Sequence, residues 1–294
     1  MFSFIKNFLI KEKDNPWLFF IVTFFLTWLF WLPAALINQS YTSTTVIVLI
    51  ILGGIAGKIV PPTLLPYLTY GKKGWNDYWQ RIIDFKRVSI KWWLITIGLP
   101  VLFVILGVIT GFFLGYPLPT FELTNPIKII PFAVFILLYG PLPEEMGWVG
   151  YELDRLQAKF NALNASLILG FFWLLWHLPL FFIEGSYQHD EVVLGSMRFW
   201  LTFVLGIICL QILQTWIYNN THRSTLTAVM IHFMVNFNGE LLNLSDIHEY
   251  LRAGWTLIFT VAVIGIFGYQ TLTGENKAPN FNKILDMGIE TDYS

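Results

Sequence analysis

Residues 90–114 read IKWWLITIGLPVLFVILGVITGFFL, a run of 25 residues in which the one charged side chain is Lys91. A helix needs about 20 apolar residues to cross the hydrocarbon core of a bilayer, because it rises about 1.5 Å per residue. The run is long enough for such a crossing. It therefore predicts a transmembrane helix, and with it the class of the whole protein.

The composition of the chain agrees with a membrane protein. Of the 294 residues, 55% are apolar, 18% are aromatic and 13% are charged, whereas soluble domains carry about 25% charged residues. Trp and Tyr rings are typical of the membrane interface. The formal net charge of −1 gives no basis for a nucleic-acid partner. The single cysteine, Cys209, excludes an intrachain disulfide and is expected to be a packing residue.

Seven further apolar stretches predict an all-α, polytopic membrane protein of about eight transmembrane helices in one bundle. The expected spans are 17–37, 44–68, 90–114, 127–149, 164–183, 198–218, 224–243 and 254–272. The second span is the least regular, because Lys58 interrupts it and prolines follow at 61 and 62. Two adjacent prolines are expected to bend or break a helix.

The chain is expected to form one domain. We find no internal repeat and no cleavable signal peptide, so residues 17–273 are predicted to be the membrane-embedded domain. Residues 1–16 mix charged and apolar side chains, which suits a cytosolic interfacial segment. Residues 274–294 are polar and are expected to form a loosely ordered cytosolic tail.

The basic residues predict an orientation. With the N-terminus inside, 14 of the 18 Lys and Arg residues fall on inner segments, and residues 70–90 form the largest basic element. The outer segments hold three, Lys128, Arg198 and Arg252, while Lys58 lies within a span. By the positive-inside rule, both termini are expected to be cytosolic.

Ionisable side chains are rare away from the ends of the expected spans, where we find Lys58, Glu144, Glu145, His177 and His232. Such groups cost several kcal/mol near the bilayer centre and are therefore functional candidates. Glu144 and Glu145 follow a glycine and two prolines at positions 140, 141 and 143, which should interrupt the helix and leave amide groups free. A carboxylate in such a place is a candidate general base.

The two histidines and one asparagine are expected to join the glutamates. His177 lies near the middle of the fifth span, and His232 lies at a similar depth in the seventh. Asn236 comes four residues after His232, so these two side chains share one helix face. A lone histidine in an apolar helix is usually structural, but two beside a glutamate pair favour a functional site.

These residues resemble the CAAX-protease and bacteriocin-processing (CPBP) family of intramembrane proteases. The family pattern is Glu-Glu-x-x-x-Arg, then Phe-x-x-x-His, then His-x-x-x-Asn or Asp. The corresponding parts of this chain are Glu144-Glu145, Trp173-Leu-Leu-Trp-His177 and His232-Phe-Met-Val-Asn236. Their order and spacing agree with the family over residues 127–243.

The chain departs from the family pattern at two positions. Val149 stands where the family has arginine, which removes a cation expected to hold the paired carboxylates. Lys58 is a possible replacement that would pair with Glu145, although snorkelling to an interface is an equal alternative. Trp173 replaces phenylalanine, an aromatic exchange expected to have no consequence. We expect an arginine at Val149 to be tolerated.

The resemblance implies an intramembrane endopeptidase with a peptide or membrane-protein substrate in a prokaryotic plasma membrane. Glu144 would activate a water with help from His177, and His232 and Asn236 would donate hydrogen bonds to the oxyanion. Glu145 would support them. The expected cavity opens to the cytosolic side between the second and fourth spans. Whether the substrate is prenylated stays open.

Three alternatives remain. A zinc metalloprotease could use the same residues, with Glu144 or Glu145, His177 and His232 as ligands. The H-E-x-x-H motif of common zinc proteases is absent, and the resemblance favours a site without a cofactor. Loss of the motif arginine at Val149 permits a non-proteolytic relative, such as a bacteriocin-immunity or scaffold protein. A transporter is the third alternative, but it should show inverted repeats.

Overall fold

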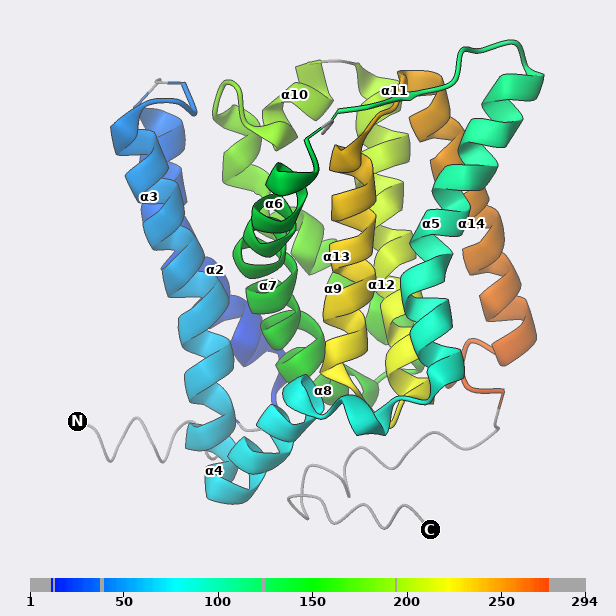
Figure 1. Cartoon of the computed structure of the whole chain (residues 1–294). Helices are drawn as coiled ribbons and strands as arrows, with labels where there is room; N and C mark the ends of the chain where they lie inside the picture. Colours follow the sequence, from blue (N-terminus) through cyan, green and yellow to red (C-terminus); the bar gives the residue numbers. More distant parts are fainter. Residues whose placement is uncertain (1–11, 13, 38–39, 123–124, 194, 275–294) are drawn as a thin grey trace.

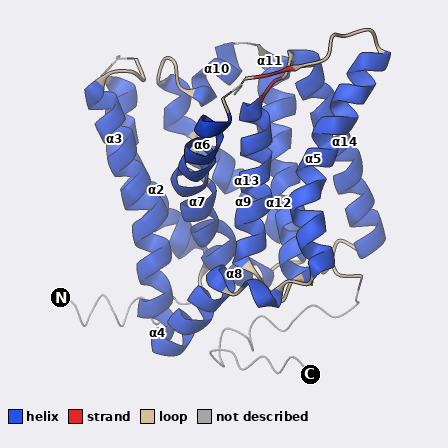
Figure 2. Cartoon of the chain, in the orientation of Figure 1, coloured by secondary structure: helices blue, strands red, loops and turns tan. Residues whose placement is uncertain are grey.

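The computed structural model describes residues 12 and 14–274 apart from 38–39, 123–124 and 194 (Figure 1). Most of the expected interfacial segment 1–16 and nearly all of the tail 274–294 lie outside these residues. The described part is helical except for one short antiparallel pair, β1 (Thr120–Phe121) with β2 (Leu242–Asn243) (Figure 2). The prediction of an all-α class is confirmed.

The helices form a single bundle. In chain order they are α2 (Pro16–Leu36), α3 (Thr44–Gly54), η1 (Ile55–Ile59), α4 (Val60–Ile83), η2 (Phe85–Arg87), α5 (Ile90–Phe113), α6 (Pro126–Tyr139), α7 (Pro141–Gly147), η3 (Trp148–Glu152), α8 (Leu153–Gln157), α9 (Ala162–Trp176), η4 (Leu178–Phe182), α10 (Tyr187–Val193), α11 (Ser196–Arg198), η5 (Phe199–Val204), α12 (Leu205–Asn220), α13 (Thr225–Leu241) and α14 (Asp246–Phe267). Seven stretches of the described chain are long and apolar enough to cross a membrane. The 17-residue α13 is shorter and packs beside α12 and α5, so the expected count of about eight is approximately right.

The second span differs from the prediction, because it continues through the two prolines to Ile83. Pro61 and Pro62 lack the N–H groups that would bond carbonyls one turn earlier, and the preceding η1 is wound as a π-helix instead of breaking. The Thr63 hydroxyl donates to the Ile59 carbonyl at 2.6 Å. The kink lies further on at Gly71, whose φ of 65° and ψ of −156° are not helical.

The fourth span is interrupted where the sequence predicts it. α6 ends at Tyr139, Gly140 leaves the helical region, and α7 starts with Pro141 at its first position. Proline is favoured at this position because its missing N–H would be unpaired there in any case. The span then extends through η3 and α8 to Gln157, beyond the predicted end at 149.

The last helix starts earlier than predicted, at Asp246 rather than 254. Its polar first turns are stabilised by ion pairs, since Glu249 bonds Arg252 within the helix and Arg198 reaches Asp246. A hydropathy pattern does not detect such a helix start, because charged residues lower the mean hydropathy even when they form ion pairs. α14 packs against α5 (Figure 1), where a Cβ at Gly107 would lie 3.0 Å from the Arg252 backbone nitrogen.

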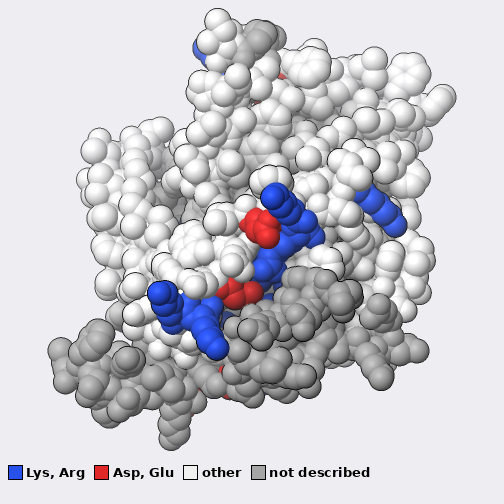
Figure 3. Space-filling view, turned by 60° about the horizontal axis from the view of Figure 1, so that its bottom comes forward, with Lys and Arg blue, Asp and Glu red and all other residues white. Residues whose placement is uncertain are grey.

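The two ends of the described bundle differ in charge. α2 starts and α14 finishes at the same end (Figure 1), and Lys and Arg side chains gather on that end when it is brought forward (Figure 3). We call it the basic end. A buried ion network also lies there: Arg81 bonds Asp77 at 2.9 Å, and Asp154 on α8 accepts from Arg223 and from the Tyr218 hydroxyl. The network anchors the segment that carries the glutamate pair.

Candidate active site

The three parts of the sequence pattern meet inside the bundle. Their residues are Glu144 and Glu145 in the first turns of α7, Trp173 and His177 at the end of α9, and His232 and Asn236 on α13. α7 packs against α13 and against η1, which carries Lys58. Five side chains are buried, and Asn236 is partly buried.

Glu144 is held by two donors from different helices. Its Oε1 accepts from the Lys58 ammonium at 2.8 Å, and its Oε2 accepts from the Trp173 indole N–H at 3.0 Å. Two predictions are corrected here. Lys58 pairs with Glu144 instead of Glu145, and the exchange of phenylalanine for Trp173 has a consequence, because phenylalanine has no N–H to donate.

Glu145 has a different environment from its neighbour. Its side chain is 0% exposed, and its Oε1 lies 2.7 Å from His232 Nδ1. When Glu145 is ionised its carboxylate can only accept, and His232 then donates from Nδ1. The Nε2 atom of His232 is then left for the cavity, in the arrangement of a histidine oriented by a carboxylate.

His177 is oriented by the backbone of its own helix. Its Nδ1 lies 2.9 Å from the Trp173 carbonyl oxygen, and a carbonyl accepts, so Nδ1 carries the proton. The ring packs edge-on against Trp176, with centroids 4.8 Å apart, and against Phe203 at 5.7 Å. Both histidines therefore present Nε2 as the nitrogen available to a substrate or water.

Asn236 lies close to the break between α6 and α7. A Cβ built on Gly140 would lie 3.8 Å from Asn236 Nδ2 and 4.0 Å from Glu144 Oε1. The amide and the carboxylate thus approach one point from two sides, and the missing side chain at Gly140 leaves room between them. A small reacting group fits such a place better than a bulky one.

A cavity of about 860 Å³ connects these groups. Glu144, His177, His232 and Asn236 line it, whereas Glu145 does not. Aromatic and aliphatic side chains form much of the remaining wall, among them Phe103, Phe132, Phe135, Ile136, Leu210, Ile231 and Val235. The cavity therefore combines a polar inner region with apolar walls.

The cavity reaches the surface at the end of the bundle opposite the basic end. Exposed lining residues there are Glu122 beside β1, Tyr187 on α10, Glu240 on α13 and Asn243 on β2. The basic end and the mouth of the cavity therefore lie at opposite ends of the bundle. The sequence predicted that both would face the cytosol, and the two predictions cannot both hold. Lys58 and Glu144 show that the second and fourth spans do line the cavity, as predicted.

An ion-pair cluster lies at this rim. Arg198 donates to Glu191 at 2.9 Å and also contacts Asp246, which joins α10, α11 and α14. Burial opposes its charge, but the hydrogen bond and charge of Glu191 raise the pKa of Arg198 above its ordinary value. The charge bias of the sequence predicts Arg198 on the outer side, but no motif assigns this residue to a cavity.

The position of the missing motif arginine is apolar and closed. The Val149 side chain is 0% exposed and belongs to the hydrophobic core. An arginine there would have to displace packed neighbours, so the expectation that it would be tolerated does not fit this packing. Arg155 does not replace it, because its guanidinium lies over the Tyr151 ring at 3.3 Å.

A metal site needs several donor side chains that converge on one point. Among the side chains that the structure describes, no three His, Cys, Asp or Glu residues are arranged so that they could hold a metal ion. One oxygen of each glutamate already has a partner from the chain, because Glu144 Oε1 accepts from Lys58 and Glu145 Oε1 lies 2.7 Å from His232 Nδ1.

The chain is similar to known proteins over the stretch that holds these residues. The sequence profile of the family described as "Type II CAAX prenyl endopeptidase Rce1-like" matches residues 126–238, which include all three motif parts. A protein of Methanococcus maripaludis named CAAX prenyl protease 2 is 29% identical over 256 residues, covering 86% of this chain and 94% of the relative. The profile match and this relative both agree with the resemblance of the three motif parts to the CAAX-protease and bacteriocin-processing family of intramembrane proteases.

Proposed function

We propose that the protein is an intramembrane endopeptidase in which Glu144 activates the attacking water. The observation that carries the proposal is that Glu144 is the member of the glutamate pair that lines the cavity. Lys58 and Trp173 each occupy one lone pair of its carboxylate oxygens, and each oxygen keeps another for a water. A carboxylate placed in this way can act as a general base.

The proposed steps use the Glu144 oxygens and the His177 ring nitrogen that the contacts within the chain leave available. Glu144 takes a proton from the water while the water oxygen attacks the scissile carbonyl carbon. His177 shares this transfer through Nε2, because its Nδ1–H is given to the Trp173 carbonyl. The proton then passes to the amine nitrogen as the carbon–nitrogen bond breaks.

Asn236 and His232 stabilise the negative oxygen of the tetrahedral intermediate. Asn236 donates from Nδ2, and His232 donates from Nε2 when its ring is protonated. The Glu145 carboxylate on His232 Nδ1 stabilises that protonated ring, as a buried carboxylate does in other catalytic dyads. Glu145 is therefore a supporting residue, and its full burial agrees with a role away from the substrate.

A C-terminal peptide that carries a prenyl group is the substrate class we propose. The name of the archaeal relative and the description of the matching family both support it. The apolar walls of the cavity suit a lipid-modified segment, while the polar inner region suits its peptide bond. We further propose that hydrolysis needs no metal, since both carboxylates already have a partner from the chain.

The test is cleavage of a farnesylated reporter peptide, and of the same peptide without the lipid, by detergent-purified protein. Wild type is compared with Glu144→Ala, His177→Ala and His232→Ala, each with and without a strong chelator. We expect wild type to cleave in chelator and each variant to lose about 100-fold or more in kcat. Activity lost to chelator and restored by zinc would replace the proposal with a metalloprotease. A Glu144→Ala enzyme of normal activity would refute it.

A further inference from the structure

Lys58 is a cation in an apolar helix, with a side chain only 10% exposed. Its ammonium donates to Glu144 Oε1 at 2.8 Å and to the Tyr139 carbonyl at 3.1 Å. It also lies 5.0 Å from the Tyr139 ring centroid and 5.3 Å from that of Trp176. A buried charge is stable only with such partners, so each contact helps to keep the ammonium at this place.

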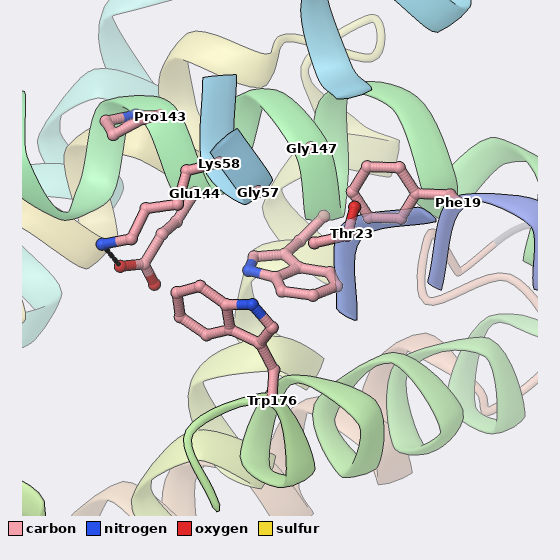
Figure 4. Close-up of a pocket in the computed structure, with 9 residues that line it drawn as sticks. Phe19, Thr23, Gly57, Lys58, Pro143, Glu144, Gly147 and Trp176 are labelled. Atoms are coloured by element: carbon pink, nitrogen blue, oxygen red, sulfur yellow. Dashed lines mark hydrogen bonds and ion pairs between the residues drawn. The ribbon is translucent and has the colours of Figure 1, made fainter. Parts of the chain in front are cut away.

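The backbone of Lys58 is placed by the packing around it (Figure 4). Lys58 belongs to the π-helical η1, which the two following prolines impose. Its neighbour Gly57 lies against α2, where an added Cβ would come within 1.7 Å of Thr27 Oγ1. The ammonium and the Glu144 carboxylate meet beside a small hollow walled by Phe19, Trp148 and Trp176. The position of the cation is therefore built into the helix.

The chain carries no cation where the family motif has its arginine, since Val149 is apolar and buried. Among the described residues, the ion pairs of the two glutamates are Lys58 with Glu144 and His232 with Glu145. The positive charge beside Glu144 thus comes from the neighbouring second span and not from the helix of the glutamates. The Trp173 N–H adds a second donor to the same carboxylate.

We propose that Lys58 takes the place of the missing motif arginine, as a positioning residue that keeps Glu144 charged and directed into the cavity. The inference rests on the proposed function of Glu144. It adds that the pair between the second and fourth spans is part of the catalytic apparatus. Trp173 completes the arrangement by fixing the other oxygen.

The test compares Lys58→Met with Lys58→Arg, and with Lys91→Met as the matched control. Lys91 is exposed near the start of α5, so its loss should leave kcat within about twofold. We expect Lys58→Met to lower kcat by about 10- to 100-fold with KM nearly unchanged. Lys58→Arg should recover most of the activity.

A double-mutant cycle measured by thermal unfolding tests the pair of Lys58 and Glu144 without measuring cleavage. We expect Lys58→Met to lower Tm in the wild-type background and much less in Glu144→Gln, because the charge partner is then absent. Equal losses in both backgrounds would overturn the inference, as would a Lys58→Met enzyme with normal kcat. If Glu144→Gln is active, the proposed function fails instead. If wild type cleaves nothing, the unfolding cycle still decides whether Lys58 acts through Glu144.

Discussion

Glu144 and Glu145 are adjacent in sequence, yet their contacts assign them different roles. Glu144 faces the cavity with a lysine and an indole as donors, whereas Glu145 faces the interior with His232 as its partner. Motif order predicted that these residues would meet. Spacing does not show which glutamate takes which partner, because that depends on the direction of each side chain in one helical turn.

Trp173 is a second case in which the sequence does not predict the partner of a side chain. In the sequence it replaces one aromatic residue by another, and nothing in the pattern distinguishes a packing ring from a hydrogen-bond donor. The N–H reaches Glu144 because α9 and α7 lie at a particular distance and rotation, which only the fold reveals. Lys58 was singled out as a misplaced charge, but its partner was predicted wrongly for this reason.

We expect Trp173→Phe to lower kcat by about tenfold, equivalent to about 1.4 kcal/mol. The variant keeps the ring and removes the hydrogen bond to the charged Glu144, and such bonds contribute about 1.5–3 kcal/mol. Trp216→Phe is the control, because the Trp216 N–H has no hydrogen-bond partner among the described residues and does not line the cavity. Equal kcat values for both variants and wild type would show that the indole donor is not used.

At the scale of elements, three π-helical turns adjoin the site. η1 carries Lys58, η3 follows α7 directly, and η5 carries Phe203, which packs against His177. The prolines of the second span predicted an irregular helix, but not that the irregularity would be a widened turn instead of a break. Whether a proline breaks a helix depends on which neighbours bond the freed carbonyls, and those neighbours come from packing.

Gly57→Ala is expected to lower both stability and activity. The added Cβ would overlap Thr27 Oγ1, which cannot turn away without losing the hydrogen bond that it accepts from Trp176 at 2.9 Å. Such overpacking costs about 1–3 kcal/mol and should move η1, and Lys58 with it. Gly54→Ala is the matched control, because its nearest atom would be Lys58 Cε at 3.8 Å. If Gly57→Ala and Gly54→Ala have the same Tm and the same kcat, the prediction is wrong.

At the scale of the whole molecule, the class, the single bundle and the approximate number of spans were predictable from apolar runs, because the bilayer sets their length. The cavity was not predictable in shape or direction. It opens away from the basic end, beside short elements such as helix α10 and strand β2, whose contacts leave no periodic pattern in the sequence.

We expect the basic end to face the cytosol and the cavity to open on the other side of the membrane. The chain has one cysteine, Cys209, so Lys73→Cys at the basic end and Asp190→Cys on α10 can be made in a Cys209→Ala background. An impermeant thiol reagent on intact cells should label Asp190→Cys and spare Lys73→Cys until lysis. The reverse labelling would place the cavity mouth in the cytosol and override the charge bias.

The central claim is that Glu144, and not its neighbour, is the general base. The most direct measurement is kcat for cleavage of the farnesylated reporter by Glu144→Gln and Glu145→Gln, with folding of each checked by thermal unfolding. The account predicts that Glu144→Gln loses about 100-fold or more, while Glu145→Gln keeps measurable turnover, because it affects the reaction through His232. A folded Glu144→Gln enzyme that cleaves as fast as wild type would contradict the account.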